Sequence, residues 1–178
     1  IAWEGVLGFA RRYAELARQL SDDKADPIRR ASLDRIAQAC EWVPENPARS
    51  FFEAVQTIRF LLEVTSFEWQ HKGSAMGRLD QYLYPYFRAD LEAGRLTFEE
   101  AVDILGDLFW YINRWDKIEF SNWRNAGQGK PHSFTTIGGV DREGNDVFNE
   151  LSYLILHLIG LLKGPEPMLC FRWHEGTP

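Results

Sequence analysis

The sequence lacks several features that mark whole classes of protein. It has only two cysteines, Cys40 and Cys170, which lie far apart and form no CxxC pair. This excludes a disulfide-built scaffold and favours a reducing, cytoplasmic setting. The longest apolar run, about residues 153–162, is interrupted by His157 and falls well short of the roughly 20 residues that a membrane helix needs. We therefore expect no membrane-spanning segment and no membrane partner.

Positive charge is also scarce. The chain has 20 Lys and Arg against 26 Asp and Glu, a net charge of −6, and its basic residues are scattered. Proteins that bind nucleic acid cluster Lys and Arg against the phosphates, so we expect no nucleic-acid partner. Apolar residues are abundant, at 45% of 178 residues with seven tryptophans. That is enough for one core and too few residues for two domains of ordinary size.

Most of the first 115 residues have helical periodicity. Apolar residues recur every three or four positions, and local signals mark where helices begin. Asp26 followed by Pro27 is typical of a helix start, and Ser50 to Glu53 and Thr97 to Glu100 have the pattern of a capping box. The predicted helices cover about residues 3–20, 27–40, 51–64, 81–92 and 98–112.

The pattern changes in the last 63 residues. Residues 116–130 lack a helical stripe and are predicted as a loop. A strand is expected at 133–137, a turn at 141–144, a helix at 149–163 and a second strand at 168–173. Strand, helix and strand in that order build parallel sheets, but two strands do not make a stable sheet alone. We therefore expect an α/β fold, dominated by helices and completed by further polypeptide.

The ends of the sequence lead to the same expectation. The chain begins at Ile1 rather than at methionine and ends at Gly176-Thr177-Pro178, directly after an apolar strand. We interpret residues 1–178 as one internal fragment of a larger domain, mainly helical over 1–115 and loop, strand, helix and strand over 116–178. A closed globule with every aromatic side chain covered and no open sheet edge would contradict this interpretation.

No complete catalytic or metal-binding set is recognisable. The four histidines do not stand at ligand spacing, so no metal is expected, and His157 is predicted to be a core or interface residue. Cys170 could be a nucleophile activated near Arg172. Its place in the apolar strand Met168–Phe171 favours a small buried side chain instead.

The most specific stretch runs from His71 to Phe87, "HKGSAMGRLDQYLYPYF". It contains two glycines, a single Arg78-x-Asp80 and several aromatic rings. One interpretation is a turn pinned by an Arg78–Asp80 pair, with Asp80 and Gln81 capping the next helix. The other is the wall of an active site. His71 and His132 stand at junctions of loops and regular elements, where a polar group can face a ligand.

Three ordered motifs carry a resemblance to a known family. "GRLDQYLYPYFRADLEAGRLTFEEA", "TIGGVDREGNDVFNELSYLIL" and "PEPMLCFRWHEGTP" resemble the glycyl radical enzymes of the pyruvate formate-lyase superfamily, as does "LDRIAQACEWVPENPARSFFEAVQTIRF". The resemblance implies part of a ten-stranded β/α barrel, with outer helices and early strands. It also implies a homodimeric parent and anaerobic radical cleavage of C–C, C–O or C–N bonds in a small organic substrate.

The same resemblance implies that the two radical-bearing residues of the family lie outside this chain. In the family, a radical S-adenosylmethionine activating enzyme installs a glycyl radical near the C-terminus, and a cysteine on an inner loop passes it to substrate. Neither residue matches a position here, so we expect no catalytic residue and no bound cofactor, and an inactive fragment without the rest of its parent chain. Substrate-binding candidates are the positions around the first and second motifs and after the last strand: His71, Lys72, Ser74, His132 and Trp173.

The resemblance does not choose a reaction. Some dehydratases of the family carry "GHS" where this chain has His71-Lys72-Gly73, whereas the "GPEP…W" strand is closer to pyruvate formate-lyase, a formate acetyltransferase. Lyase, dehydratase and decarboxylase chemistry all stay open. Two hypotheses from other classes also stay open: a helical scaffold or interaction module whose exposed tryptophans bind a partner, and a small enzyme that depends on Cys170.

Overall fold

The structure is a computed structural model that describes residues 2–22, 26–69, 73–114 and 132–177. The chain divides into two compact units, residues 1–64 and 65–178. Each unit has its own buried side chains. The predicted loop at 116–130 lies outside the described residues.

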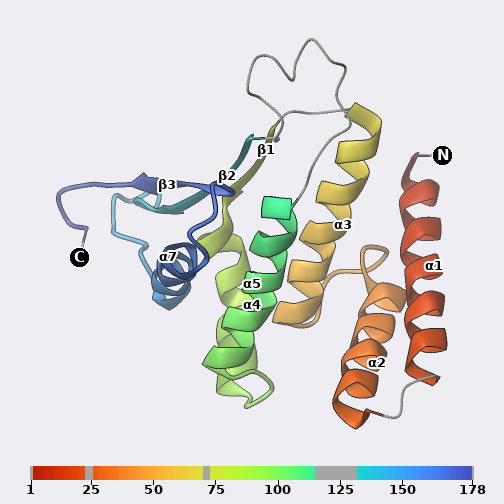
Figure 1. Ribbon diagram of the computed structural model, residues 1–178. Coiled ribbons are helices and arrows are strands. Elements are labelled where there is room, and N and C mark those ends of the chain that lie inside the picture. Colours follow the sequence, from red (N-terminus) through yellow and green to blue (C-terminus); the bar gives the residue numbers. More distant parts are fainter. Residues whose placement is uncertain (1, 23–25, 70–72, 115–131, 178) are drawn as a thin grey trace. The chain divides into compact units, whose positions relative to one another are not determined.

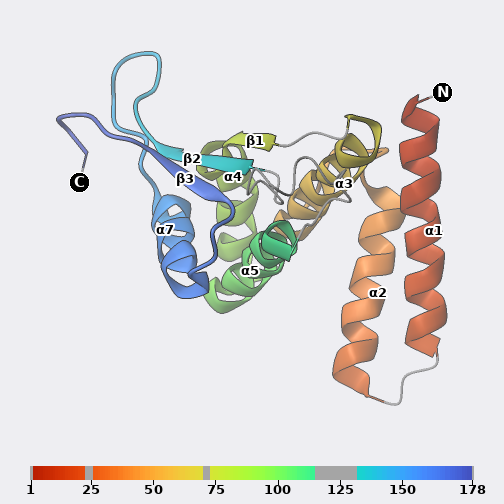
Figure 2. The ribbon, with the colours of Figure 1, turned by 45° about the horizontal axis from the view of Figure 1, so that its top comes forward.

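The first unit contains an antiparallel pair of helices, α1 (Ala2–Asp22) and α2 (Pro27–Trp42), which lie side by side in both ribbon views (Figure 1, Figure 2). Small side chains on α1 are buried: Ala10, Ala14 and Ala17. They allow the two backbones to approach closely. Asp26 caps α2 by accepting a hydrogen bond from the Ile28 amide, as the sequence predicts.

Helix α3 (Phe51–Trp69) begins at the predicted Ser50 signal, with different partners from those expected. Ser50 Oγ accepts from the Glu53 amide at 3.2 Å, which is half of a capping box. The Glu53 carboxylate accepts instead from the Arg49 amide at 2.7 Å and pairs with the Arg49 guanidinium. Further along α3, Phe60 packs into a cluster with Ala10, Ala14 and Cys40.

The second unit contains a parallel sheet in the order β1 (Gly73–Arg78), β2 (His132–Gly138), β3 (Met168–Arg172). The sequence predicts only the last two of these strands, and β1, within the stretch His71–Phe87, is an additional strand that it does not predict. The β1 sequence, GSAMGR, has no β-branched or aromatic residue and therefore gives no strand signal.

Among the residues that the structure describes, three helices accompany the sheet: α4 (Leu79–Glu92), α5 (Phe98–Arg114) and α7 (Glu150–Leu162). Helix α4 packs on β1 and β2, and α7 packs on α4 and α5 (Figure 1, Figure 2). The largest fully buried side chains of this unit come from all three helices and from β2: Leu79, Leu83, Phe87, Leu105, Leu108, Phe109, Ile112, Ile137, Leu151, Leu154 and Ile155.

The burial of His157 differs from its prediction, whereas the unpaired edge strands agree with theirs. The sequence predicts His157 as a core or interface residue. It is exposed, so a core position is wrong, and an interface position stays a prediction: α7 buries the face that carries Leu154, Ile155 and Leu158. Among the described residues, β1 and β3 each pair only with β2, which leaves both edges of the sheet open. The open edges are what the fragment hypothesis predicts.

No helix in the described ranges is long and apolar enough to cross a membrane.

Helix α5 offers a local test of the capping signals. Thr97 N–H donates to Glu100 Oε2 at 2.8 Å, and Glu100 N–H donates to Thr97 Oγ1 at 3.1 Å, a complete capping box. Thr97→Ala removes one half, and we expect the free energy of unfolding, measured with urea, to fall by about 1 kcal/mol. Glu99→Ala, one residue away and outside the box, serves as the control. A Thr97→Ala chain no less stable than the control would show that the box adds nothing.

Candidate functional site at the carboxyl edge of the sheet

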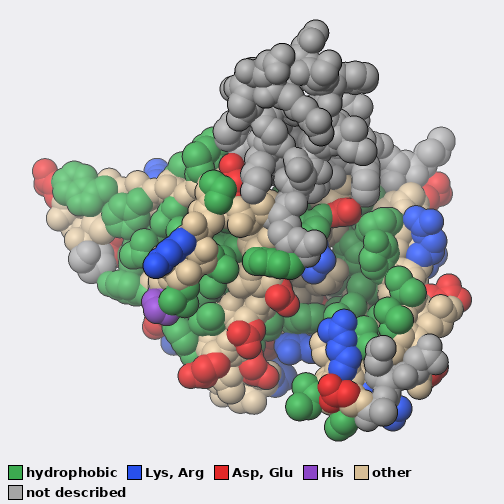
Figure 3. Space-filling view, viewed as in Figure 1, with side chains coloured by type: hydrophobic (Ala, Val, Ile, Leu, Met, Phe, Trp, Pro, Cys, Tyr) green, Lys and Arg blue, Asp and Glu red, His purple; other side chains and the backbone are tan. Residues whose placement is uncertain are grey.

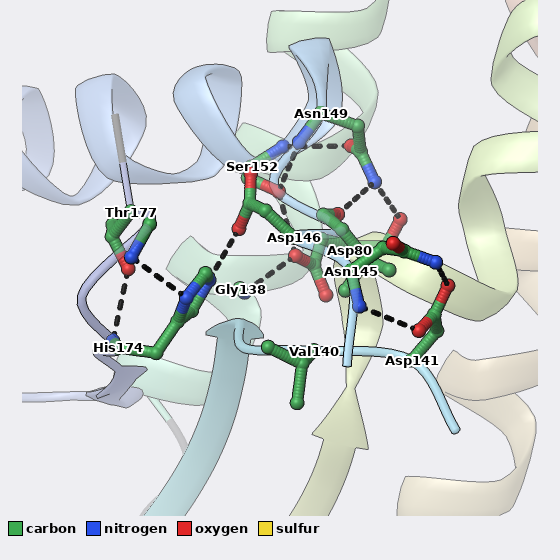
Figure 4. Close-up of polar contacts among 12 residues, drawn as sticks. Asp80, Gly138, Val140, Asp141, Asn145, Asp146, Asn149, Ser152, His174 and Thr177 are labelled. Atoms are coloured by element: carbon green, nitrogen blue, oxygen red, sulfur yellow. Dashed lines mark hydrogen bonds and ion pairs between the residues drawn. The ribbon is translucent and has the colours of Figure 1, made fainter. Parts of the chain in front are cut away.

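A group of hydrogen-bonded polar residues lies where the parallel strands end (Figure 4). Arg78 ends β1, Gly138 ends β2, and His174 follows β3. Asn149 caps α7 here, accepting from the Leu151 and Ser152 amides in a capping box that involves Ser152 Oγ. Open parallel α/β sheets bind their ligands at this edge.

Asp80 is the central acceptor of this edge. Its side chain is fully buried, and Oδ2 accepts from the Gly138 amide at 2.8 Å and from Ser152 Oγ at 2.6 Å. The carboxylate thus joins the first turn of α4 to the end of β2 and to the first turn of α7 (Figure 4). The predicted role of Asp80 as a helix cap is wrong, because α4 begins after Arg78 without a side-chain cap.

Arg78 binds the same turn as Asp80. Its Nη2 donates to the Gly138 carbonyl at 2.9 Å and its Nη1 to the Val140 carbonyl at 3.4 Å. A β-bulge between Ala75 and Arg78, with Gly77 at φ 66°, places Arg78 opposite Thr136 of β2. The alternative of a direct Arg78–Asp80 pair is therefore wrong: each side chain holds residues 138–140 instead.

The polar and aromatic side chains of α4 fasten this helix to its surroundings. Gln81 Nε2 donates to the Val147 carbonyl at 2.9 Å, and the Tyr82 hydroxyl donates to the Met76 carbonyl at 2.9 Å. The Tyr84 hydroxyl donates to Glu150 at 2.5 Å. Burial raises the pKa of Tyr82 well above its ordinary value, so this phenol stays a donor at any physiological pH. The side chains of the "DQYLY" motif thus hold α4 against β1, the loop before α7 and the start of α7.

One face of the sheet carries exposed apolar side chains. Ala75, Phe134 and Met168 lie in register across the three strands, and all three are exposed. Alternate residues of a strand face opposite sides, so Ser133, Thr135 and Ile137 lie on the other, buried face of β2. Figure 3 shows hydrophobic side chains at the surface around β3. Sequence reasoning missed Phe134 and Met168, although the alternation of 133–137 is the signal that separates the two faces.

The structure separates the predicted substrate-binding residues. His71 and Lys72 lie outside the described residues. Ser74 and His132 stand at the beginnings of β1 and β2, with Gly73 opposite His132 and Ser74 opposite Ser133. Trp173 follows β3 at the opposite edge and is 71% exposed. All five assignments stay predictions. Ser74 and His132 lie at the beginnings of their strands, and Trp173 follows the end of β3.

A groove on the surface of α4 contains none of the predicted substrate-binding residues. A groove of about 300 Å³ lies along α4, lined by Tyr84, Phe87, Arg88, Leu91, Glu92 and Glu150. Its charged groups are paired, Arg88 with Glu92 at 2.7 Å and Tyr84 with Glu150. Within the part of the chain that the structure describes, no three His, Cys, Asp or Glu side chains are grouped to hold a metal ion.

Comparison with known proteins decides the family. The family model described as pyruvate formate lyase-like matches residues 1–178. The chain belongs to the pyruvate formate lyase-like family. The resemblance read from the three motifs is confirmed. The expected fold class is also confirmed, a helix-dominated α/β chain that forms part of a glycyl radical enzyme barrel.

Individual pyruvate formate lyase-like relatives agree. The chain is 35% identical to the isethionate sulfite-lyase of Oleidesulfovibrio alaskensis and 32% identical to the (2S)-3-sulfopropanediol dehydratase of Klebsiella oxytoca, matching 100% of this chain in both cases. The crystal structure of a glycyl radical enzyme from Archaeoglobus fulgidus superposes on 98% of this chain with a TM-score of 0.91 and 34% identity. The chain spans only 22% of the length of the two curated relatives and 23% of the crystal chain.

The two cysteines have opposite environments. Cys170 is exposed, so the prediction of a buried strand cysteine is wrong. Cys40 is buried, and burial raises the pKa of its thiol to about 11. Because the thiolate is the reactive form, we expect iodoacetamide at about pH 8 to alkylate Cys40 at least about 100-fold more slowly than Cys170.

Peptide mass spectrometry after timed quenching measures both rates, and the same reaction in concentrated urea is the control, in which the two rates should converge. Equal labelling of the native chain would contradict the burial of Cys40. An inert Cys170 would also count against its role as a nucleophile.

Proposed function

We propose that this chain is part of a glycyl radical enzyme that breaks a bond in a small organic substrate under anaerobic conditions. The observation that carries the proposal is the match of the pyruvate formate lyase-like family to the whole of the chain. The names of the relatives favour lyase or dehydratase chemistry over the acetyl transfer of formate acetyltransferase.

The part of this chain in such an enzyme is to build the wall of the barrel. Strands β1 to β3 provide a continuous parallel segment, α4 supports it from one side, and α7 packs on α4 and α5. The opposite face, with Phe134 and Met168, is turned toward the reaction chamber in this proposal. A closed, largely apolar chamber keeps water away from reactive intermediates. The substrate contacts of His71, Lys72, Ser74, His132 and Trp173 belong to the same proposal.

The radical chemistry itself belongs to the parent enzyme. A glycyl radical on a residue outside this chain, installed by a radical S-adenosylmethionine activating enzyme, would generate a thiyl radical that abstracts a hydrogen atom from the substrate. The parent is proposed to work as a homodimer. None of the residues 1–178 is assigned a catalytic role.

Electron paramagnetic resonance of the parent polypeptide tests this function. After anaerobic incubation with its activating enzyme, S-adenosylmethionine and a reductant, we expect a glycyl radical doublet that disappears on exposure to oxygen. The parent with its radical-bearing glycine replaced by alanine is the control. Product analysis with isethionate, 2,3-dihydroxypropane-1-sulfonate and pyruvate with coenzyme A then separates the reaction types. A correctly folded, activated parent that gives no radical would contradict the proposal.

A non-catalytic interaction module is the second candidate, favoured by the exposure of Trp3, Trp110 and Trp173, which are 49%, 51% and 71% exposed. Exposed tryptophans often mark contact surfaces. The same experiment separates the candidates, because a module predicts no radical in the parent. It also predicts that the 178-residue chain by itself binds a partner through these tryptophans.

A further inference from the structure

His174 closes a short turn after β3 through both nitrogens of its ring. Its Nδ1 accepts a hydrogen bond from the Gly176 amide at 3.1 Å, and its Nε2 lies 2.7 Å from Asp146 Oδ1. The backbone completes the turn: His174 N–H donates to Thr177 Oγ1 at 2.9 Å, and Thr177 N–H donates to the His174 carbonyl at 3.0 Å (Figure 4). We call His174, Asp146, Gly176 and Thr177 the His174 clasp.

These contacts specify one form of the ring. A backbone amide can only donate, so Nδ1 must present a lone pair to Gly176. The ring proton is therefore on Nε2, where it is donated to the Asp146 carboxylate. The clasp as built holds the neutral Nε2–H tautomer, although Asp146 by itself would also accept a charged ring.

Protonation brings the two contacts into conflict. A proton on Nδ1 would face the Gly176 N–H, donor against donor, whereas the charge of the ring would strengthen the contact with Asp146. Asp146 is fixed by the hairpin at 140–146, in which Val140 bridges Asp146 and Val147 N–H donates to the Gly139 carbonyl. The movable partner is the Gly176 turn, whose glycine is exposed.

The other charged groups near the clasp are those of Asp141, Arg172 and Glu175. Asp141 of the hairpin accepts from the side chain of Asn145 and from the amides of Asn145 and Glu143, and these bonds lower its pKa further below neutrality. Arg172 precedes the clasp in the sequence, and Glu175 lies within residues 174–177 with its side chain exposed.

We propose that the His174 clasp is a proton-sensitive fastening at the carboxyl edge of the sheet: the neutral ring closes residues 174–177, and the protonated ring releases Gly176 while it keeps Asp146. The exits of β2 and β3 stay joined in both forms. Only the segment after β3 opens in acid. This inference does not depend on the proposed radical chemistry.

Nuclear magnetic resonance of the ¹⁵N-labelled 178-residue chain tests the clasp. Long-range ¹H–¹⁵N correlation at about pH 8 should show Nδ1 of His174 as the unprotonated nitrogen and Nε2 as the protonated one. Amide exchange of Gly176, corrected for its intrinsic pH dependence, should be about fivefold less protected at about pH 5.5 than at about pH 8, the effect of one neutral hydrogen bond.

Two variants of His174 separate the roles of its two ring nitrogens, Nδ1 and Nε2. His174→Asn places an acceptor where Nδ1 stands and cannot titrate, so Gly176 should stay protected at both pH values. His174→Gln reaches toward Asp146 without that acceptor, so Gly176 should lack protection at both. The difference spectrum of His174→Asn also assigns the ring signals of His174 among the four histidines.

The wild-type chain alone can overturn the proposal, should either variant fail to fold. A protonated Nδ1 at about pH 8 would contradict the tautomer, and equal Gly176 protection across the pH range would contradict the release. Loss of the His174–Asp146 contact in acid, seen as exchange of Asp146 and Val147 together with Gly176, would show general unfolding of the edge instead.

Discussion

Replacement of Asp80 by alanine is expected to lower the free energy of unfolding of the 178-residue chain by about 3 kcal/mol. The substitution leaves the Gly138 amide and the Ser152 hydroxyl without their acceptor, and Asp80 is fully buried, so bulk water does not replace it. Hydrogen bonds to a charged group cost more to remove than neutral ones. Three elements, α4, β2 and α7, lose their common partner at once.

Three other variants make the Asp80 result specific. Ser152→Ala removes one of the two donors and should cost about half as much. Asp80→Asn keeps the volume, and its single oxygen can take the place of Oδ2, which accepts both hydrogen bonds. It loses only the charge, so its cost should be smaller than that of Asp80→Ala. Asp141→Ala removes an acidic residue with several hydrogen bonds from the exposed hairpin and is the control. Urea unfolding of all four chains checks the order.

Hydrogen exchange of the Gly138 amide measures the effect of Asp80→Ala at one hydrogen bond. It should accelerate strongly in Asp80→Ala, because this amide loses its only described acceptor in the edge. If Asp80→Ala costs no more than Asp141→Ala, the buried carboxylate does not hold the edge together.

The helices were predictable because their signals are local. Asp26 with Pro27, the capping box at Thr97 and Glu100, and Asn149 before α7 each act within four residues of a helix start. The sequence therefore contains nearly all the information that places these ends. Strand β1 gave no such signal, since a Gly- and Ala-containing strand is held by its pairing with β2, about 60 residues away.

The site was less predictable because its contacts are long-range. Arg78 reaches Gly138 across 60 positions, and Asp80 reaches Ser152 across 72. Both residues stood out in the sequence, but no local pattern indicates which distant backbone groups they bind. A direct Arg78–Asp80 pair, one of the two interpretations that the sequence leaves open, joins the two nearest charges and is wrong.

Burial was misjudged where it depends on neighbouring elements. Cys170 and Phe171 form an apolar strand, yet both are exposed, because β3 is an edge strand among the described residues. His157 is exposed because α7 packs on α4 and α5 with only one face, which carries Leu154, Ile155 and Leu158. Apolar composition predicts that a segment seeks a partner, and it does not tell whether the partner lies within the same 178 residues.

Replacement of Gly139 by alanine is expected to destabilise the chain strongly, and Gly144 provides the matched control. Both have φ near +89°, where a side chain is strained. An added Cβ at Gly144 meets nothing within 4 Å, whereas at Gly139 it would lie 3.1 Å from Arg172 Cβ and 3.3 Å from Arg172 Cδ. We expect Gly144→Ala to cost about 1 kcal/mol from backbone strain, and Gly139→Ala about 3 kcal/mol, since overpacking adds to the same strain.

A double variant identifies the source of the difference. Arg172→Gly removes the atoms that the new methyl group would strike, so the combination of Gly139→Ala with Arg172→Gly should cost less than the sum of the two single changes. Gly144→Ala with Arg172→Gly should be additive, because Gly144 has no atom of Arg172 within 4 Å. Equal costs for the two glycine variants would mean that β3 does not press on residue 139. Recovery in the double variant would show that the exits of β2 and β3 are packed against each other at this residue.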